Sequence, residues 1–344
     1  MEHYVGLDVS QLETHVCVLD RDGEVIWQGK TSSNPEDLAD CIRKRAPHAV
    51  RVGLETGPLS TWHWHGLNNL GVPIICLCAR HAKAALKMQL NKTDRNDARG
   101  LAEIMRTGWY RSVQVKSLQS HAVLSKLGVR AKLIDIRRDL ASQIRGIMKT
   151  FGLIVGTARR QIFERRVLEL LDGSTEIAAI VEPLLSVWRT IGEQIAKVEK
   201  VLLDCARDNE ECRRLMTMPG VGAITALTFL GNVDEADRFT RSRSLGAYFG
   251  LTPRRYQSGE VDLSGHISKC GSGMMRSYLF EAALTLLTRV KKWSSLKAWA
   301  MQVARRKGLK KAAVALARKM AVTMFAMLRD KSEYRWSARE EAAA

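Results

Sequence analysis

The chain has 344 residues, and its 54 Lys and Arg residues outnumber its 36 Asp and Glu residues, which gives a formal net charge of +18. This length suffices for one large hydrophobic core or for two to three smaller ones, and no apolar run is long enough to cross a membrane. The excess of positive charge favours nucleic acid as a partner, because phosphates that are neutralised by basic side chains release counterions.

The first 77 residues alternate between patterns typical of strands and of helices. A strand is predicted at residues 3–9, and a hairpin is predicted around the Asp-Gly pair at 22–23. The further predicted elements are a helix at 35–45, a strand at 50–55, a helix at 61–70 and a strand at 72–77. Three sequential strands followed by alternating helices and strands predict an α/β layer arrangement, and the order fits an RNase H-like sheet.

Two of these strands carry an acidic residue. Asp8 interrupts an apolar strand, where aspartate is disfavoured, and Glu55 ends another strand. Each shares a strand face with a glycine, Gly6 or Gly53, which leaves room above the sheet. Taken alone, each acid has an ordinary explanation, a hydrogen bond at a strand edge or a solvated turn. If the two strands are neighbours, the carboxylates lie close together.

Residues 92–99 place two aspartates three residues apart at the expected start of a helix. Thr93 suits the N-cap. An apolar stripe follows at helical spacing: Ala98, Leu101, Ala102 and Met105. Asp94 and Asp97 precede members of this stripe by four residues, so we expect both carboxylates on its inward face. Acids in a first turn also simply favour the helix dipole, but inward carboxylates repel unless a cation holds them. Together with the two strand carboxylates, they would suit two Mg²⁺ ions.

Residues 116–210 show the periodicity of long helices and are predicted as a helical spacer. One stripe steps by three and four: Leu133, Ile136, Leu140, Ile144, Ile147 and Phe151. A second stripe covers four heptads: Ile177, Val181, Leu184, Trp188, Ile191, Ile195, Val198, Leu202 and Cys205. The second stripe predicts a coiled coil, and Pro183 is expected to bend or end one segment. Such helices pair within one chain or join two chains, and we favour a homodimer or a dimer of dimers.

A second globular region is predicted at 211–330, followed by a frayed tail at 331–344. Met218-Pro219-Gly220-Val221-Gly222 resembles the turn of a helix-hairpin-helix motif. Gly220 and Gly222 would let backbone amides approach a phosphate at a helix N-terminus, although an ordinary glycine-rich turn is the alternative. The remaining predicted elements are helices at 223–230, 242–249, 274–290, 294–306 and 310–328, with a loop at 251–273.

The motifs together resemble those of the DEDD transposases of bacterial insertion elements, the Piv-like recombinases. The N-terminal half contributes Gly6-Leu7-Asp8-Val9-Ser10, Glu55-Thr56-Gly57 and Lys92-Thr93-Asp94-Arg95-Asn96-Asp97-Ala98. The C-terminal half contributes Pro219-Gly220-Val221-Gly222, residues 247–259 and Lys269-Cys270-Gly271. No single motif is enough to identify the family, but the motifs occur in the family's order over most of the chain.

The resemblance implies an RNase H/RuvC-like domain at 1–115 in which Asp8, Glu55, Asp94 and Asp97 hold Mg²⁺. It also implies a mainly α C-terminal transposase domain with a serine nucleophile, here Ser258. The residues alone do not choose Ser258 over four other hydroxyls: Tyr256, Ser264, Ser268 and Ser272.

The residues do place this serine beside a glycine, shortly after two arginines that could bind a phosphate. The candidate nucleic-acid contacts are Lys92, Arg99, Gly220, Gly222, Arg254, Arg255, Tyr256 and Lys269.

The predicted function is therefore Mg²⁺-dependent cleavage and exchange of DNA strands through a covalent phosphoserine. By resemblance, a structured bridge RNA from the same element guides the protein to double-stranded DNA. One alternative is a RuvC-like nuclease or junction resolvase that uses water, and another is a nucleic-acid-binding protein without catalytic activity. The seven cysteines form no Cys-x-x-Cys pair and the N-terminus lacks a secretion signal, so we expect a protein of the bacterial cytoplasm, associated with the nucleoid.

Overall fold

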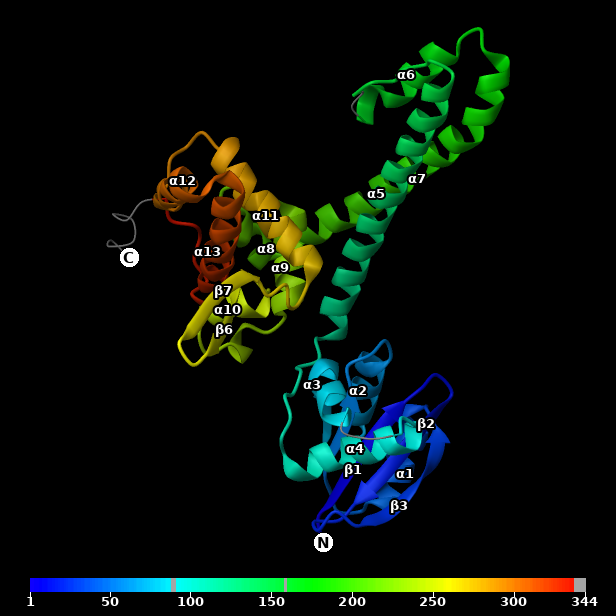
Figure 1. Cartoon of the computed structure of the whole chain (residues 1–344), viewed down its shortest axis with the longest axis vertical. Helices are drawn as coiled ribbons and strands as arrows, with labels where there is room; N and C mark the ends of the chain where they lie inside the picture. Colours follow the sequence, from blue (N-terminus) through cyan, green and yellow to red (C-terminus); the bar gives the residue numbers. More distant parts are fainter. Residues whose placement is uncertain (88–90, 158–159, 337–344) are drawn as a thin grey trace. The chain divides into compact units, whose positions relative to one another are not determined.

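A computed structural model describes residues 1–87, 91–157 and 160–336. The chain forms two compact units, Met1–Leu118 and Gln119–Ala344 (Figure 1). No helix in the described ranges is both long enough and apolar enough to span a membrane.

The N-terminal unit is built on one five-stranded sheet. Its strands are β1 (His3–Val9), β2 (Glu13–Leu19), β3 (Val25–Ser32), β4 (Ala49–Glu55) and β5 (Ile74–Leu77). They lie in the order β3-β2-β1-β4-β5, with β1 antiparallel to β2 and parallel to β4. The three sequential strands and the later alternation of helices and strands are confirmed.

Two pairs of helices cover the two faces of this sheet. The pair on one face is α1 (Pro35–Arg45) and α2 (Ser60–Asn69), and the pair on the other is α3 (Ala79–Leu86) and α4 (Asp94–Thr107). Val5 and Leu7 of β1 belong to the core under α1, whereas Tyr4 belongs to the core under α4. Strand β1 thus presents successive residues to opposite faces of the sheet, and helix α3 is an element that the sequence patterns did not predict.

The second unit begins with long helices, α5 (Leu118–Thr150), α6 (Arg160–Leu171) and α7 (Thr175–Asp208). The stripe of α7 is largely buried within the chain, at Val181, Trp188, Ile195 and Leu202. Helices α5 and α7 are joined by the Arg130–Glu199 ion pair at 2.8 Å and by Arg137, whose guanidinium carbon lies 3.8 Å from the Trp188 ring centre. Pro183 lies inside α7, so it does not end a segment, and the alternative that it bends the helix stays a prediction.

The rest of the unit is a helical bundle with one hairpin. Its elements are α8 (Glu210–Met216), α9 (Ala223–Val233), η1 (Ala236–Arg238), α10 (Ser244–Tyr248), β6 (Pro253–Ser258), β7 (Val261–Ile267), α11 (Gly273–Thr288), α12 (Ser295–Lys307) and α13 (Leu309–Arg329). Leu127 of α5 and Leu202 of α7 share a core with these helices, and Gln119–Ala344 is one compact unit.

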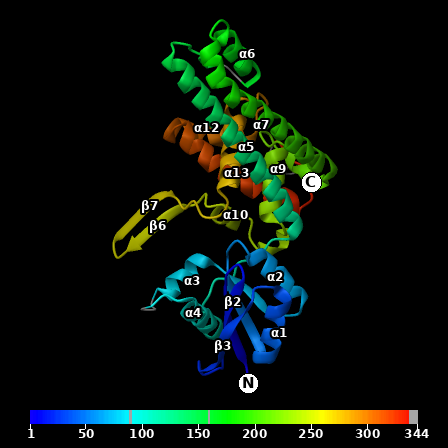
Figure 2. The same cartoon turned by 90° about the vertical axis from the view of Figure 1, so that its right-hand side faces the viewer.

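Two expectations for this region need correction, and a third, for Gly220, stays a prediction. The predicted loop at 251–273 contains the hairpin β6–β7, which Figure 2 shows extending away from the helices of its unit. Gly220 has φ +88° and packs against α11, since a Cβ there would lie 2.4 Å from the Ala282 carbonyl oxygen, and its predicted contact with a phosphate stays a prediction. The tail does not fray from its start, since the Tyr334 amide donates to the Thr217 hydroxyl at 2.9 Å and the Tyr334 side chain is buried. Residues 337–344 lie outside the described part of the chain.

Candidate active site

Strands β1 and β4 bring two carboxylates to the same edge of the sheet. Gly6 pairs with Gly53 and Leu7 with Leu54 in a parallel register, so Asp8 and Glu55 come next on adjacent strands. Both acids are half-buried. The condition that the two strands be neighbours is therefore met.

Helix α4 lies directly on the glycines that precede these acids. A Cβ on Gly6 would come within 2.2 Å of the Ala98 carbonyl oxygen, and one on Gly53 would meet the Met105 side chain at 2.7 Å. The predicted room above the sheet is thus filled by backbone and core side chains of α4. This close packing brings the first turn of α4 to the strand ends that carry the acids.

The first turn of α4 has the predicted cap, since the Thr93 hydroxyl accepts a hydrogen bond from the Asn96 amide at 3.2 Å. Asp97 is half-buried, as expected. Asp94 is not inward, because its side chain is 71% exposed. The buried stripe begins one turn later, at Ala98, so the first residue of the helix lies outside the buried part of its interface with the sheet. The Asp94 carboxylate instead lies 3.8 Å from Nε2 of His15.

The carboxylates act on one another electrostatically. Burial raises the pKa of Asp8, and the negative charges of Asp94 and Asp97 raise it further. Burial also raises the pKa of Glu55, with further contributions from Asp8 and Asp97. His15 and Lys92 oppose the shift of Asp8 only in part, and Lys92 and Lys83 oppose that of Glu55 only in part. The site therefore holds more negative charge than its own basic residues neutralise.

A divalent cation would neutralise this charge, and carboxylate oxygens are ligands that Mg²⁺ accepts. In the described ranges, however, no three His, Cys, Asp or Glu side chains gather closely enough to enclose a metal ion. The donor set fits a divalent cation in its chemistry, while its oxygens are spread more widely than a coordination sphere.

The predicted nucleophile lies in the other unit, at the tip of the hairpin. Ser258 ends β6 and pairs with Val261, so Gly259 and Glu260 form a two-residue turn. Gly259 has φ +55°, which the first central position of such a turn requires and which glycine adopts without strain. Ser258 is exposed, and it shares a face of the hairpin with Tyr256 and Leu263.

The residues predicted to contact phosphate differ in their hydrogen bonds within the chain and in their exposure. The Arg255 guanidinium donates two hydrogen bonds of 2.7 Å to the Asp262 carboxylate, which lowers the pKa of Asp262. Arg254 donates to the Ser268 carbonyl oxygen at 3.3 Å, and Tyr256 is 64% exposed. The remaining candidates are all exposed: Lys92, Arg99, Gly222 and Lys269.

His15 was missed at the sequence level. It is the cross-strand partner of Asp8 on β2, and it approaches Asp94 as well. A single histidine in a strand forms no sequence motif that would indicate a functional site. Only the register between β1 and β2 reveals that it lies among the carboxylates.

Known proteins match both halves of the chain. A family model described as "Transposase", of the DEDD type named for IS110, matches residues 5–152, and one described as "Transposase IS116/IS110/IS902 family" matches residues 212–299. A transposase for insertion sequence element IS1111A from Coxiella burnetii is 30% identical over 97% of this chain and 92% of its own length. A protein from Pseudomonas aeruginosa described as a "probable family 20 transposase" is 27% identical over 96% of this chain and 98% of its own length.

Proposed function

The chain belongs to the IS110/IS116 family of insertion-element transposases, and we propose that it cuts and rejoins DNA through Ser258, aided by Asp8, Glu55, Asp94 and Asp97. The observation that carries this proposal is the packing of α4 on β1 and β4, which joins acids from three elements in one electrostatic site. The strand order, with three antiparallel strands followed by two parallel ones, supports an RNase H/RuvC-like assignment of the N-terminal unit.

The proposed chemistry is a transfer of one phosphodiester bond. The Ser258 oxygen forms a bond to phosphorus, the bond from phosphorus to the adjoining nucleotide breaks, and the departing oxygen takes a proton to become a hydroxyl. A hydroxyl of a second strand later displaces the serine by the reverse step. Since the bond energy is kept in the phosphoserine, no nucleoside triphosphate is required. A divalent cation held by the four carboxylates would neutralise phosphate charge.

The residues of the chain support these steps in distinct ways. Asp8, Glu55, Asp94 and Asp97 would hold the divalent cation, which would position the phosphate and activate the serine hydroxyl so that it releases its proton to water. Arg254 lies on the same strand as Ser258 and offers a guanidinium to the phosphate. Arg255 is held by Asp262 and stiffens the hairpin that presents the serine.

The test is a search for a covalent protein–DNA adduct. The full chain is incubated with Mg²⁺, DNA of the element ends and the RNA of the element, and the products are separated under denaturing conditions. We expect an adduct that is lost in Ser258→Ala and kept in Tyr256→Phe, a matched control on the same strand and face. Cleavage that persists in Ser258→Ala without an adduct would instead identify a hydrolytic nuclease. Binding without cleavage in every variant would identify a non-catalytic protein.

We propose further that a structured RNA selects the DNA. Support comes from the net charge of +18 and from residues 282–329, which contain twelve Lys or Arg and no Asp or Glu. Omitting the RNA from the same reaction should abolish the adduct at element ends. An adduct formed equally well without RNA would contradict this part of the proposal.

We also propose that two copies associate through α7. Apart from its buried stripe, this helix exposes Ile180, Val187 and Val201, which recur at multiples of seven residues on its outer side. Ile180→Glu combined with Val187→Glu should convert a dimer into a monomer in light scattering. The same substitutions should leave the helix content unchanged, because both positions face solvent within one chain.

A further inference from the structure

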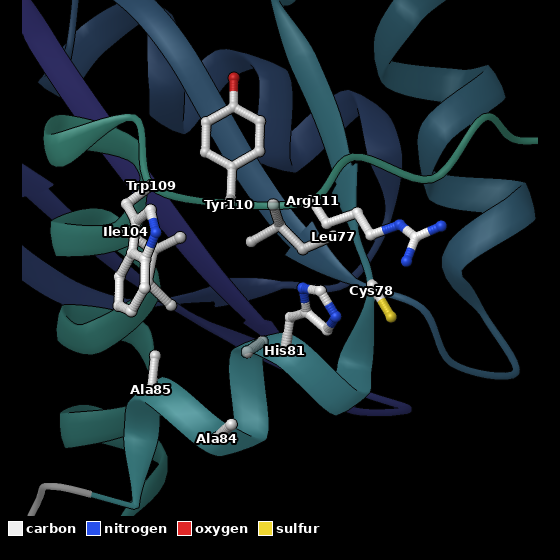
Figure 3. Close-up of a pocket in the computed structure, with 10 residues that line it drawn as sticks. Leu77, Cys78, His81, Ala84, Ala85, Ile104, Trp109, Tyr110 and Arg111 are labelled. Atoms are coloured by element: carbon white, nitrogen blue, oxygen red, sulfur yellow. The ribbon is translucent and has the colours of Figure 1, made fainter. Parts of the chain in front are cut away.

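The N-terminal unit contains a cavity of about 570 Å³ between α3 and the segment that follows α4 (Figure 3). Its floor and wall are small or apolar: Leu77, Ala82, Ala85 and Ile104. This volume lies in the range of pockets that bury a small organic ligand. The side chains that line it include no acid.

The rim of the cavity is aromatic and basic. Trp109 follows the end of α4, and its side chain is 81% exposed. Figure 3 shows its indole on one side of the cavity next to Ile104, with His81 on the side of α3. Tyr110 and Arg111 continue the segment that carries Trp109 along the cavity. An exposed indole beside an apolar hollow is a stacking surface, and a guanidinium close by suits a phosphate.

The cavity adjoins the carboxylates through the sheet. Leu77 of β5 is the register partner of Glu55 on β4, and the Thr56 amide donates to the Leu77 carbonyl oxygen at 2.9 Å. Adjacent strands lie about 4.8 Å apart, and paired residues point to the same face of a sheet. The wall of the cavity therefore begins one strand away from Glu55, on the face that α4 covers.

We propose that this cavity binds one unstacked nucleobase of the DNA strand that is being cut. The base would stack on the Trp109 indole, and its backbone would pass Arg111. This inference rests on the proposed function, because a strand whose phosphate lies at the carboxylates would lie one β-strand away from Leu77 in the cavity wall. A flat base with a phosphate suits both an apolar hollow and a basic rim, whereas an apolar side chain of a second copy would use only the hollow.

The experiment uses the full chain without Mg²⁺ and a single-stranded DNA probe of about 12 nucleotides, a length within the span of known single-strand sites. The probe carries 5-iodouracil at its centre and is cross-linked by light, after which the modified peptide is identified by mass spectrometry. We expect the cross-link on the segment that contains Trp109. Trp109→Ala should lose it and weaken binding roughly tenfold, the size of one stacking contact.

Two controls make the result specific. Trp62→Ala removes another exposed indole of the same unit, on the sheet face that α2 covers, and should bind like the wild type. A probe with an abasic site at its centre should bind the wild type more weakly than the intact probe, but should bind Trp109→Ala no differently from the intact probe. If the abasic probe loses the same affinity for the wild type and for Trp109→Ala, the proposal is overturned. A cross-link in Trp109→Ala as strong as that in the wild type would overturn it too.

The remaining outcomes separate this inference from the proposed function. Asp8→Asn should still cross-link at Trp109 while forming no adduct, because base binding does not need the carboxylates. If no adduct forms in any protein but the Trp109 cross-link persists, the nucleobase site stands and the proposed function fails. If the adduct forms and Trp109→Ala binds like the wild type, the nucleobase site fails alone. A stronger Trp109 cross-link to RNA of the same sequence would overturn the assignment to DNA.

Discussion

At the scale of single residues, Gly6 allows helix α4 to lie directly on strand β1. The helix backbone occupies the place where any side chain at position 6 would project, because a Cβ there would lie 2.2 Å from the Ala98 carbonyl oxygen. Asp8, two residues later on the same face, is thereby placed beside the first turn of α4. The glycine and the aspartate of this strand serve one purpose, which is to bring carboxylates of the sheet and the helix together.

Gly6→Ala should therefore destabilise the N-terminal unit by about 1–3 kcal/mol or more, the usual cost of forcing extra volume into a packed core. Chemical denaturation followed by circular dichroism measures the change. Gly57→Ala is the matched control, since a Cβ there meets nothing within 4 Å. A Gly6→Ala protein as stable as Gly57→Ala would show that α4 does not rest on β1 in this way.

The carboxylates should also make stability depend on pH. Burial and like charge raise the pKa values of Asp8 and Glu55 in the folded protein. At pH values between the pKa of these carboxyls in the unfolded protein and their higher pKa in the folded protein, the folded state therefore binds more protons than the unfolded state. The free energy of unfolding should thus fall as pH rises from about 4, where unfolded carboxyls titrate, through the folded values. Asp8→Asn should raise the melting temperature at pH 7 in EDTA and flatten this decline. Glu24→Gln, an exposed acid outside the site, should do neither.

Bound Mg²⁺ should stabilise the folded protein, whereas the repulsion between the carboxylates destabilises it. A cation that binds the folded site stabilises it by mass action, so Mg²⁺ should raise the melting temperature of the wild type by a few degrees. The rise should vanish in Asp8→Asn, because one ligand and one negative charge are gone. A rise of the same size in both proteins would place the bound Mg²⁺ elsewhere.

At the scale of elements, the hairpin β6–β7 shows why some structure escapes sequence patterns. A strand is usually recognised because one face is apolar and buried, but every residue of β6 is exposed. Gly259 marks the turn, yet without alternation on either side the segment looks like a loop. Helix α4, in contrast, has a cap, a stripe and a buried face, and these local signals predict its start at Asp94 to the residue.

Contacts between residues that are far apart in the sequence set a second limit on what sequence patterns can predict. Gly220 resembles a phosphate-binding glycine because its neighbours suit a helix N-terminus. Its close partner is Ala282, which is distant in sequence and leaves no local trace. The exposure of Asp94 is a similar case, since spacing along a helix gives the face on which a residue lies but not how far its side chain is covered.

The turn between α12 and α13 concentrates positive charge, and it should bind phosphates. Its exposed basic residues are Arg305, Arg306, Lys307, Lys310 and Lys311. Lys310→Ala combined with Lys311→Ala should weaken DNA or RNA binding uniformly across sequences. The slope of log affinity against log salt should fall by about 1 for each phosphate that is no longer neutralised. The matched pair Lys197→Ala and Lys200→Ala, exposed on α7, should leave that slope unchanged. Equal slopes for both double variants would remove this turn from the binding surface.

At the scale of the whole molecule, the proposed catalytic residues are divided between two units. The four acids lie in Met1–Leu118, and Ser258 lies in Gln119–Ala344. Each unit has its own core, so neither part of the site needs the other in order to fold. Such a division lets the carboxylates of one copy serve the serine of another, as the proposed association through α7 would allow.

Mixing two inactive variants tests this arrangement. In an equal mixture of Asp8→Ala and Ser258→Ala, half of randomly formed dimers pair the two variants, and each such dimer has one intact shared site out of two. We therefore expect adduct formation to return to about a quarter of the wild-type level. The control mixture is Asp8→Ala with Glu55→Ala, which must stay inactive because every site then lacks a carboxylate. If the first mixture is as inactive as the control while both variants bind DNA normally, the acids and the serine of one chain act together.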